Sequence, residues 1–362
     1  MAIERSILKE LTNKTLDAYL AARQYDQLFF KTYFPFKRVS SLTYTTLIGD
    51  KGNMIAADVV SYDSSAPLKI RKKVNSLTGK IPAIRMKKTM TESDILEYFQ
   101  LGNLADTDSK KALVELVFND VDACFDGIQA RLEWLALKVM SLGYIALAKT
   151  DNDGIVTENN IDFQVPAGNK TGVAVLWSAA VATTTPLTDI RAVQVLARAN
   201  GHQLKYALMR PEQFAQFRAS TEVQNEMGYY QIGSTALPKA PNLGTVNEYL
   251  LADDLPQIRI IDQSITTEDD AGDQTAGNPW SLGKVTFIHQ DKLGKMLSAP
   301  LAAQISPPKQ EFQAVKDNVL IAKWRDTDPV TEKTRGEINA FPSFEEADRV
   351  YYMNALNVTT WS

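Results

Sequence analysis

The chain contains almost none of the residues that most often bind metals or form covalent cross-links. Its 362 residues include one cysteine, Cys124, and two histidines, His202 and His289. A single cysteine cannot form a disulfide within the chain, and the two histidines lie far apart in sequence, without metal-ligand spacing. We therefore expect neither a metal site nor a cofactor.

Long apolar runs and catalytic signatures are also missing. No run of about 18 apolar residues could cross a membrane, and residues 1–10 lack the apolar segment of a secretory signal. The motifs G-x-S-x-G, H-E-x-x-H and G-x-G-x-x-G do not occur. Gly272–Gly277 has the spacing of a phosphate-binding loop, but Asn278 stands where that loop requires lysine. We expect a protein that is not an enzyme and has no membrane partner.

Composition places the chain among ordinary folded proteins. Hydrophobic residues make up 44% of the sequence and charged residues 23%, as in globular domains. The length is sufficient for two or three domains. A net charge of −4 argues against nucleic-acid binding as the main task of the whole chain.

The longest helical pattern runs over residues 109–148. Apolar or small residues recur there at steps of three and four, which places them on one face of an α-helix. They are Leu113, Val117, Val121, Cys124, Ile128, Leu132, Leu135, Val139, Leu142 and Ala146. Either a coiled coil or a sheet could bury this face. We favour a sheet, because Gly127 costs a helix about 1 kcal/mol and the rings of Phe118, Phe125 and Trp134 broaden the apolar face beyond a coiled-coil seam.

An aromatic cluster follows a short amphipathic helix expected over residues 3–24. The cluster contains Phe29, Phe30, Tyr33, Phe34 and Phe36. Rings at this density bury a large area. Two readings remain open: the rings anchor this segment in the chain's own core, or they belong to an arm that reaches onto a neighbour.

Residues 64–91 contain no acidic residue and follow two short strands expected within residues 39–60. The positive residues of this stretch are Lys69, Arg71, Lys72, Lys73, Lys80, Arg85, Lys87 and Lys88. Thr78-Gly79 marks the expected tip of an extended hairpin. The stretch is a solvated loop, a nucleic-acid-binding arm, or a loop that docks on an acidic neighbouring surface.

The acidic stretch that follows favours docking. Residues 92–126 contain nine acidic residues against two lysines. Glu115, Asp122 and Asp126 lie on the helix face opposite the apolar row. We expect the basic loop of one copy to dock on these carboxylates of the next copy, with complementary charge fixing the register.

The rest of the chain mixes expected helices and strands. Asp151–Gly154 resembles part of a calcium-binding loop. However, Lys149 stands where the first aspartate ligand belongs and Asn160 where the bidentate glutamate belongs, so we expect a turn leading into a hairpin at 155–165. The pattern then predicts helices at 186–199 and from 210, strands at 206–209, 258–261 and 284–288, and an exposed, mobile loop at 266–279. Strands at 319–324, 335–340 and 349–356 follow. These elements predict an α+β fold.

Several short segments in this order carry a resemblance to a known family. They are Leu28–Phe30, Tyr33–Phe36, the turn and hairpin at Asp151–Phe163, Leu176–Ser178, Pro186, Asp189–Ile190, Lys323–Arg325, Asp328-Pro329 and Phe341–Val350. The chain resembles the major capsid proteins of tailed phages, which share the Hong Kong phage capsid fold. The likeness is closest to the lambda-type branch, major capsid protein E.

The resemblance implies a phage capsid fold with five parts. They are an N-terminal arm at 1–45, an extended loop at 46–92 that overlaps an adjacent subunit, a peripheral domain at 93–175 with the spine helix 109–148, an axial domain at 176–300, and a C-terminal return to the peripheral domain at 301–362. Only some forty residues precede the loop, so we expect any scaffolding protein to be a separate chain.

The resemblance also implies a function. It indicates a structural subunit that assembles as hexamers and pentamers into an icosahedral capsid, enclosing double-stranded DNA without sequence-specific binding. Expected partners are a portal, a separate scaffolding protein and a decoration protein, with assembly in the host cytoplasm and residence in the virion. Two alternatives stay open: an encapsulin-like nanocompartment shell on the same fold, and a soluble α/β enzyme with 176–300 as its catalytic domain.

Overall fold

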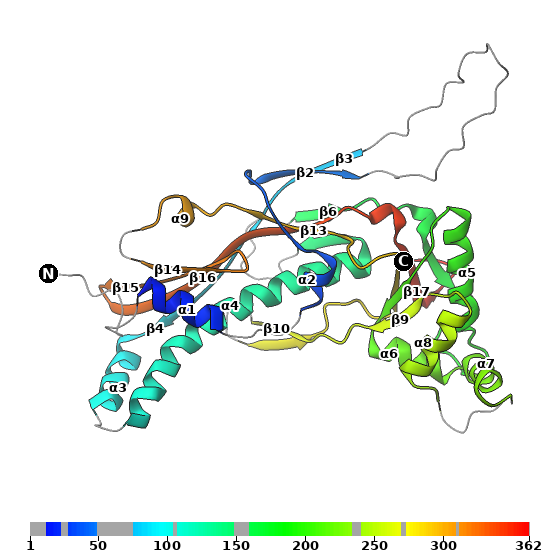
Figure 1. The fold of residues 1–362 in the computed structure, drawn as a ribbon, viewed down its shortest axis with the longest axis horizontal. Helices are drawn as coiled ribbons and strands as arrows, with labels where there is room; N and C mark the ends of the chain where they lie inside the picture. The colour runs from blue at the N-terminus through cyan, green and yellow to red at the C-terminus, as the bar shows by residue number, and fades with distance from the viewer. Residues whose placement is uncertain are drawn as a thin grey trace, which may run out of the picture. The chain divides into compact units, whose positions relative to one another are not determined.

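The computed structural model describes residues 12–22, 28–48, 75–103, 107–147, 159–233, 240–268, 273–308 and 311–361. Helices and strands are mixed along the chain, which confirms the α+β prediction (Figure 1). The chain divides into two compact units. The first combines Met1–Tyr44, Thr78–Leu135 and Lys295–Ser343, and the second combines Thr45–Leu77, Ala136–Gly294 and Phe344–Ser362. Each unit therefore draws on segments that are far apart in the sequence.

A six-stranded sheet forms the centre of the first unit. Its strands are β1 (Phe36–Arg38), β13 (Gly294–Ala299), β16 (Val330–Phe344), β15 (Val319–Thr327) and β14 (Phe312–Lys316), in that order, with β4 (Ala83–Met90) also paired to β16. The helices of this unit are α1 (Asn13–Ala22), α2 (Phe29–Tyr33), α3 (Glu92–Asn103), α9 (Ala302–Ile305) and most of α4 (Thr107–Leu142). A separate two-stranded ladder joins β2 (Thr43–Ile48) to β3 (Asn75–Lys80).

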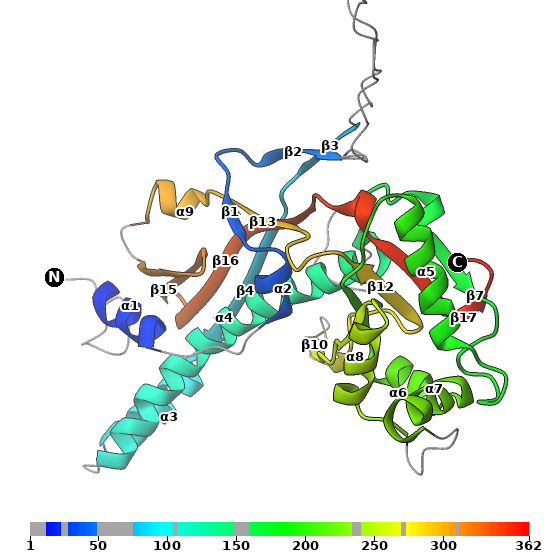
Figure 2. The same cartoon turned by 45° about the vertical axis from the view of Figure 1, so that its right-hand side comes forward.

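Helix α4 lies along this sheet, beside β4 and β16 (Figure 2). A Cβ on Gly127 of α4 would overlap the sulfur of Met86 on β4. A Cβ on Gly336 of β16 would lie only 2.7 Å from the carbonyl oxygen of Cys124. The side chains that α4 buries include Val121, Cys124, Phe125, Ile128 and Leu132, all with 0% exposure. The preference for a sheet over a coiled coil is confirmed, and two glycines permit the close approach.

The prediction that this helix continues to residue 148 is wrong. Helix α4 ends at Leu142, and Gly143 then adopts a φ of +75° while its N–H donates to the carbonyl of Val139. A left-handed glycine directly after a helix is a common C-terminal cap. The chain continues as β5 (Tyr144–Leu147), which pairs with β6 (Asn159–Asp162). The expected hairpin therefore begins earlier than residue 155, and the turn at Asp151–Gly154 lies outside the described residues.

The second unit is built around a five-stranded sheet with the order β7-β17-β12-β8-β9. Its strands are β7 (Lys170–Val173), β17 (Tyr351–Val358), β12 (Lys284–Ile288), β8 (Tyr206–Met209) and β9 (Gln257–Ile260). Its helices are α5 (Pro186–Ala199), α6 (Pro211–Ala219), α7 (Thr221–Ile232) and α8 (Leu243–Ala252), with short 3₁₀ turns at Ala167–Asn169 and Ala347–Arg349. Helices and sheet share one core that contains Trp177, Phe217, Phe287 and Tyr351.

Several expected elements of the second unit coincide with observed ones. The helix at 186–199 is α5, and the strands at 206–209 and 284–288 are β8 and β12. The segment predicted as an exposed, mobile loop at 266–279 is largely exposed in its described part, but it is not a plain loop, because β10 (Ile265–Glu268) and β11 (Gln274–Gly277) form an antiparallel hairpin there. The C-terminal segment divides between the units: β15 and most of β16 belong to the first, and β17 to the second.

A buried ion pair lies between the sheet and α4. The Nζ atom of Lys323 on β15 lies 3.0 Å from Oε1 of Glu332 on β16, with side-chain exposures of 1% and 0%. It also donates a hydrogen bond to Oγ1 of Thr334. Asp120 of α4 belongs to the same environment: burial raises the pKa of its carboxyl, while Lys323 and Lys88 oppose that effect.

Removing one charge of this ion pair should lower the free energy of unfolding far more than replacing both charges by apolar side chains. Glu332→Gln leaves the Lys323 ammonium buried without its counter-ion, so the free energy of unfolding falls by about 3–5 kcal/mol. The double variant Lys323→Met with Glu332→Leu replaces both charges by apolar groups and stays within about 1–2 kcal/mol of the parent chain. Urea denaturation of unassembled subunits measures both values, and equal losses in the two variants would contradict the argument.

The close approach at Gly336 is testable in the same way. Gly336→Ala forces a methyl group against the backbone of Cys124, and overpacking of this kind costs about 1–3 kcal/mol. Gly168→Ala is the matched control, because a Cβ there meets no atom within 4 Å. Urea midpoints should fall for Gly336→Ala and remain near the parent value for Gly168→Ala.

Candidate intersubunit surfaces

The described parts of the chain contain no group of three or more His, Cys, Asp or Glu residues that could hold a metal ion. Within those same ranges, no helix combines the length and apolarity needed to cross a membrane. The site residues expected from the sequence are basic, acidic and aromatic side chains, and the structure gives each group a different place.

The basic residues do not form one hairpin. Lys69, Arg71, Lys72 and Lys73 lie outside the described residues. Lys80 belongs to β3, which pairs with β2, whereas Arg85, Lys87 and Lys88 belong to β4, which pairs with β16. The prediction of a hairpin tip at Thr78-Gly79 is therefore wrong, because both residues lie within β3 and the two arms have different partners.

Basic side chains of β4 lie near acidic side chains of the same chain. Arg85 lies opposite Glu337 in the register, and its Nε is 3.4 Å from a carboxylate oxygen of Glu337. A hydrogen bond from Lys333 holds the pKa of Asp326 below its ordinary value, and the charge of Lys87 adds to that effect. Docking of these side chains on a neighbour stays a prediction, but β4 itself is a strand of the central sheet.

The three acidic residues that we expected to form one docking surface do not share one environment. The prediction that Asp122 contributes to a docking surface is wrong, because only 6% of it is exposed and its carboxylate accepts a hydrogen bond of 2.6 Å from the hydroxyl of Tyr19. Asp126 is exposed on α4. The side chain of Glu115 lies outside the described residues. Tyr19 of α1 contacts Asp122 and Phe118, on the face of α4 where the sequence led us to expect the loop of a neighbouring copy.

The aromatic cluster lies in the first unit of its own chain. Phe30, Tyr33 and Phe34 are 0–2% exposed, whereas Phe29 and Phe36 are half-buried. The rings of Phe30 and Phe36 pack edge to face with centroids 5.7 Å apart. Strand β1, which begins at Phe36, pairs in parallel with β13. The structure therefore agrees with the first of the two readings for these rings.

Glu133 fixes the start of α2 and was not anticipated from the sequence. Its two carboxylate oxygens accept hydrogen bonds from the backbone N–H groups of Phe29, at 3.0 Å, and Phe30, at 2.8 Å. Burial raises the pKa of Glu133 to about 7, and the two N–H donors only partly oppose this shift. The sequence signal for this role is weak, because a glutamate on the polar face of a helix normally faces water.

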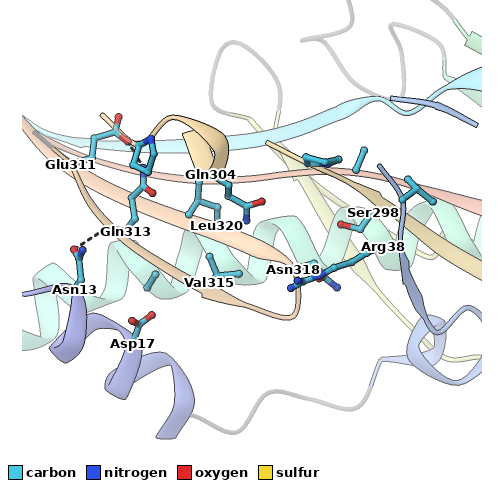
Figure 3. A pocket seen from close by; sticks show the side chains of 15 residues that line it. Asn13, Asp17, Arg38, Ser298, Gln304, Glu311, Gln313, Val315, Asn318 and Leu320 are labelled. Atoms are coloured by element: carbon cyan, nitrogen blue, oxygen red, sulfur yellow. Dashed lines mark hydrogen bonds between the residues drawn. The ribbon is translucent and has the colours of Figure 1, made fainter. Parts of the chain in front are cut away.

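A groove of about 710 Å³ lies over the edge of the first unit's sheet (Figure 3). Asn13 and Asp17 of α1 line it beside Gln313 and Val315 of β14. Asn13 accepts a hydrogen bond from the backbone N–H of Gln313, and Arg38 of β1 donates one to Asn318. Amide and carboxylate groups beside an apolar floor suit a segment of extended polypeptide, which needs both kinds of contact.

Comparison with known proteins identifies a family. The family model of phage major capsid protein E matches residues 12–353. No curated protein sequence matches the chain.

Solved structures share the fold at low sequence identity. A putative capsid protein from a prophage of E. coli CFT073 is 16% identical with a TM-score of 0.57, covering 95% of this chain and 99% of that one. A phage-related protein from Bordetella bronchiseptica RB50 is 10% identical with a TM-score of 0.52, covering 96% of this chain and 98% of that one. The predicted phage capsid fold is thereby confirmed. The chain belongs to the phage major capsid protein E family, whose members form the capsids of tailed phages.

Proposed function

We propose that the chain assembles with its own copies into hexamers and pentamers of an icosahedral phage head that encloses double-stranded DNA. The family match over residues 12–353 carries this proposal. Portal, separate scaffolding and decoration proteins are proposed partners, assembly takes place in the host cytoplasm, and DNA is enclosed without sequence-specific contacts.

The domain roles suggested by the resemblance are part of the proposal, with one adjustment. Because β4 pairs within the central sheet, we assign the loop role to the sequence between β2 and β3, residues 49–74. This sequence carries Lys69, Arg71, Lys72 and Lys73. The spine helix and central sheet then serve as the peripheral domain, and residues 176–294 of the second unit as the axial domain.

The groove of the first unit is the proposed receptor for this loop on a neighbouring copy. Among the described residues that line the groove, Asp17 and Glu311 carry carboxylates and Arg38 a guanidinium. The carboxylate of Glu311 lies 3.6 Å from the guanidinium of Arg335, so Asp17 is the acidic group proposed to receive the loop. Opposite charges favour encounter and fix register more than they add affinity. Asp126, exposed on α4, is the second candidate receptor.

The size of the purified protein tests the proposal as a whole. Electron microscopy of the chain expressed alone, and with its genomic neighbours, should show closed shells. Shells that enclose cargo proteins without a portal or DNA would favour the nanocompartment. A monomer or dimer at every concentration and salt would overturn the proposal and favour the enzyme.

Charge reversal tests the loop. Lys72→Glu with Lys73→Glu should reduce shell formation sharply, because like charges at an interface cost several kcal/mol, while the circular dichroism of the subunit stays unchanged. Lys205→Glu with Lys292→Glu is the matched control, since both lysines are exposed and lie on the second unit. Normal shells from the loop variant, or equal losses in the control, would contradict docking.

Compensating substitutions in the loop variant identify its receptor. Adding Asp17→Lys should restore assembly if the groove receives the loop, and adding Asp126→Lys should restore it if α4 does. Rescue by neither substitution would exclude both surfaces as partners of Lys72 and Lys73. Electron microscopy and sedimentation velocity provide the yield of shells.

Arg85→Glu should lower the folding stability of the isolated subunit, whereas the loop variant should lower only the yield of shells. It places a carboxylate opposite the buried Glu337 in the sheet, and like charges across strands destabilise by about 1 kcal/mol or less. Lys292→Glu, an exposed site with the same change of charge, should leave stability unchanged. Urea denaturation of unassembled subunits measures this difference, and unaltered stability of Arg85→Glu would contradict the pairing with Glu337.

A further inference from the structure

The chain on either side of the β2–β3 ladder is tied to the sheet of the first unit. Figure 2 shows β1 leading into β2, and β3 leading into β4. Before the ladder, β1 pairs with β13, and the N–H of Val39 donates to the carbonyl of Ser298 at 2.9 Å. After the ladder, β4 pairs with β16, beginning at Ala83 opposite Asn339. Strands β13 and β16 are neighbours in the sheet, so both attachments lie on adjacent strands.

The ring of Tyr44 joins these two stretches of chain. A Cβ on Gly79 would lie 2.8 Å from its hydroxyl oxygen and 2.9 Å from two of its ring carbons. The same ring stacks on Phe341 of β16, with centroids 5.5 Å apart and planes inclined by 23°. Beside it, the N–H of Ile81 donates to the carbonyl of Leu42 at 2.8 Å. We call residues 42–44 and 79–81 the root of the ladder, and they belong to the first unit together with Phe341.

The aromatic ring, and not the hydroxyl group, makes this contact. Tyr44 is 4% exposed and Phe341 is 0% exposed, and a stacked pair of buried rings stabilises the segments that carry it. The Tyr44 hydroxyl is buried and has no hydrogen-bond partner within the described ranges, which by itself is destabilising. Tyr44→Phe should therefore preserve the contact, whereas Tyr44→Ala should remove it.

Gly79 provides the space for the ring. It is not among the glycines with positive φ, so the backbone conformation does not require glycine here. The distances of 2.8–2.9 Å do require it, because a methyl group at this position would displace the ring of Tyr44. The root is therefore held from both strands of the ladder.

We propose that Tyr44 is a positioning residue of assembly: its ring holds the root of the ladder on the sheet, and the root presents residues 49–74 to a neighbouring copy. This inference rests on the proposed function, in which those residues dock on that copy. A loop that moves freely at its root loses conformational freedom when it docks, whereas a loop that is held at its root loses less. Tyr44 itself is buried in its own chain, so it acts on assembly through the loop.

Hydrogen exchange of full-length, unassembled subunits tests the contact. In Tyr44→Ala, protection of the amides in residues 42–48 and 75–81 should fall at least about tenfold, because the buried ring no longer opposes local opening. Amides of β15 are the internal reference for the sheet and should keep the parent protection. Unchanged protection of the ladder, or an equal loss in β15, would overturn the proposal.

The yield of shells tests the consequence for assembly. Tyr44→Ala should lower the yield severalfold, and Tyr44→Phe should keep it. Gly79→Ala disturbs the same contact from the other strand and should also lower the yield, whereas Gly168→Ala is the matched control, because a Cβ there meets no atom within 4 Å. Parent yield from Tyr44→Ala, or a loss in Tyr44→Phe as large as in Tyr44→Ala, would overturn the proposal.

A double-mutant cycle with Lys72→Ala separates positioning from a general effect on stability. If Tyr44 acts through the loop, Tyr44→Ala and Lys72→Ala weaken the same docking contact, and their combined effect on the concentration needed for assembly is less than additive. Strictly additive effects, with shells forming normally in the parent chain, would overturn this inference alone. Absence of shells from the parent chain would instead contradict the proposed function, and this inference with it.

Discussion

The close contact of α4 with the central sheet is the constraint on which the rest of the first unit depends. Gly336 on β16 lets the strand approach the backbone of α4 at Cys124, and Gly127 on α4 leaves room for the side chain of Met86 on β4. These contacts orient α4 about its axis. They thereby determine which residues of α4 enter the apolar core and which face α1 and α2.

The two faces of α4 consequently have different chemistry. Towards the sheet, burial of Ile128 and Leu132 gives an attraction that does not depend on pH. Towards α1 and α2, Asp122 accepts a hydrogen bond from the Tyr19 hydroxyl, and Glu133 accepts hydrogen bonds from the backbone N–H groups of Phe29 and Phe30. Apolar burial therefore attaches α4 to the sheet, whereas directional hydrogen bonds position the N-terminal helices on its other face.

Sequence patterns predicted the local elements well and the distant pairings poorly. Periodicity identified α4, α5, β8 and β12, because each is set by the residues within it. The partner of β4 is β16, which lies more than 240 residues further along the chain, and no local pattern specifies such a pairing. The roles of Asp122 and Glu133 were inaccessible for the same reason: a carboxylate on the polar face of a helix appears solvated until the segment that covers it is known.

Strand pairing also divides a group of charges that the sequence presents as continuous. Arg85 and Lys87 lie on β4, where Arg85 forms an ion pair with Glu337 of the same chain and the charge of Lys87 helps to lower the pKa of Asp326. Lys72 and Lys73 precede β3 in the sequence and lie outside the described residues. Strand β4 pairs with β16 in the first unit, and it follows β3, the strand at which the proposed loop ends. A docking segment gains specificity when its attachment point is fixed, since less conformational freedom is then lost on binding. Under the proposed function, the pairing of β4 with β16 restricts the chain that follows the loop, and Lys72 and Lys73 are the charges proposed to make the contact.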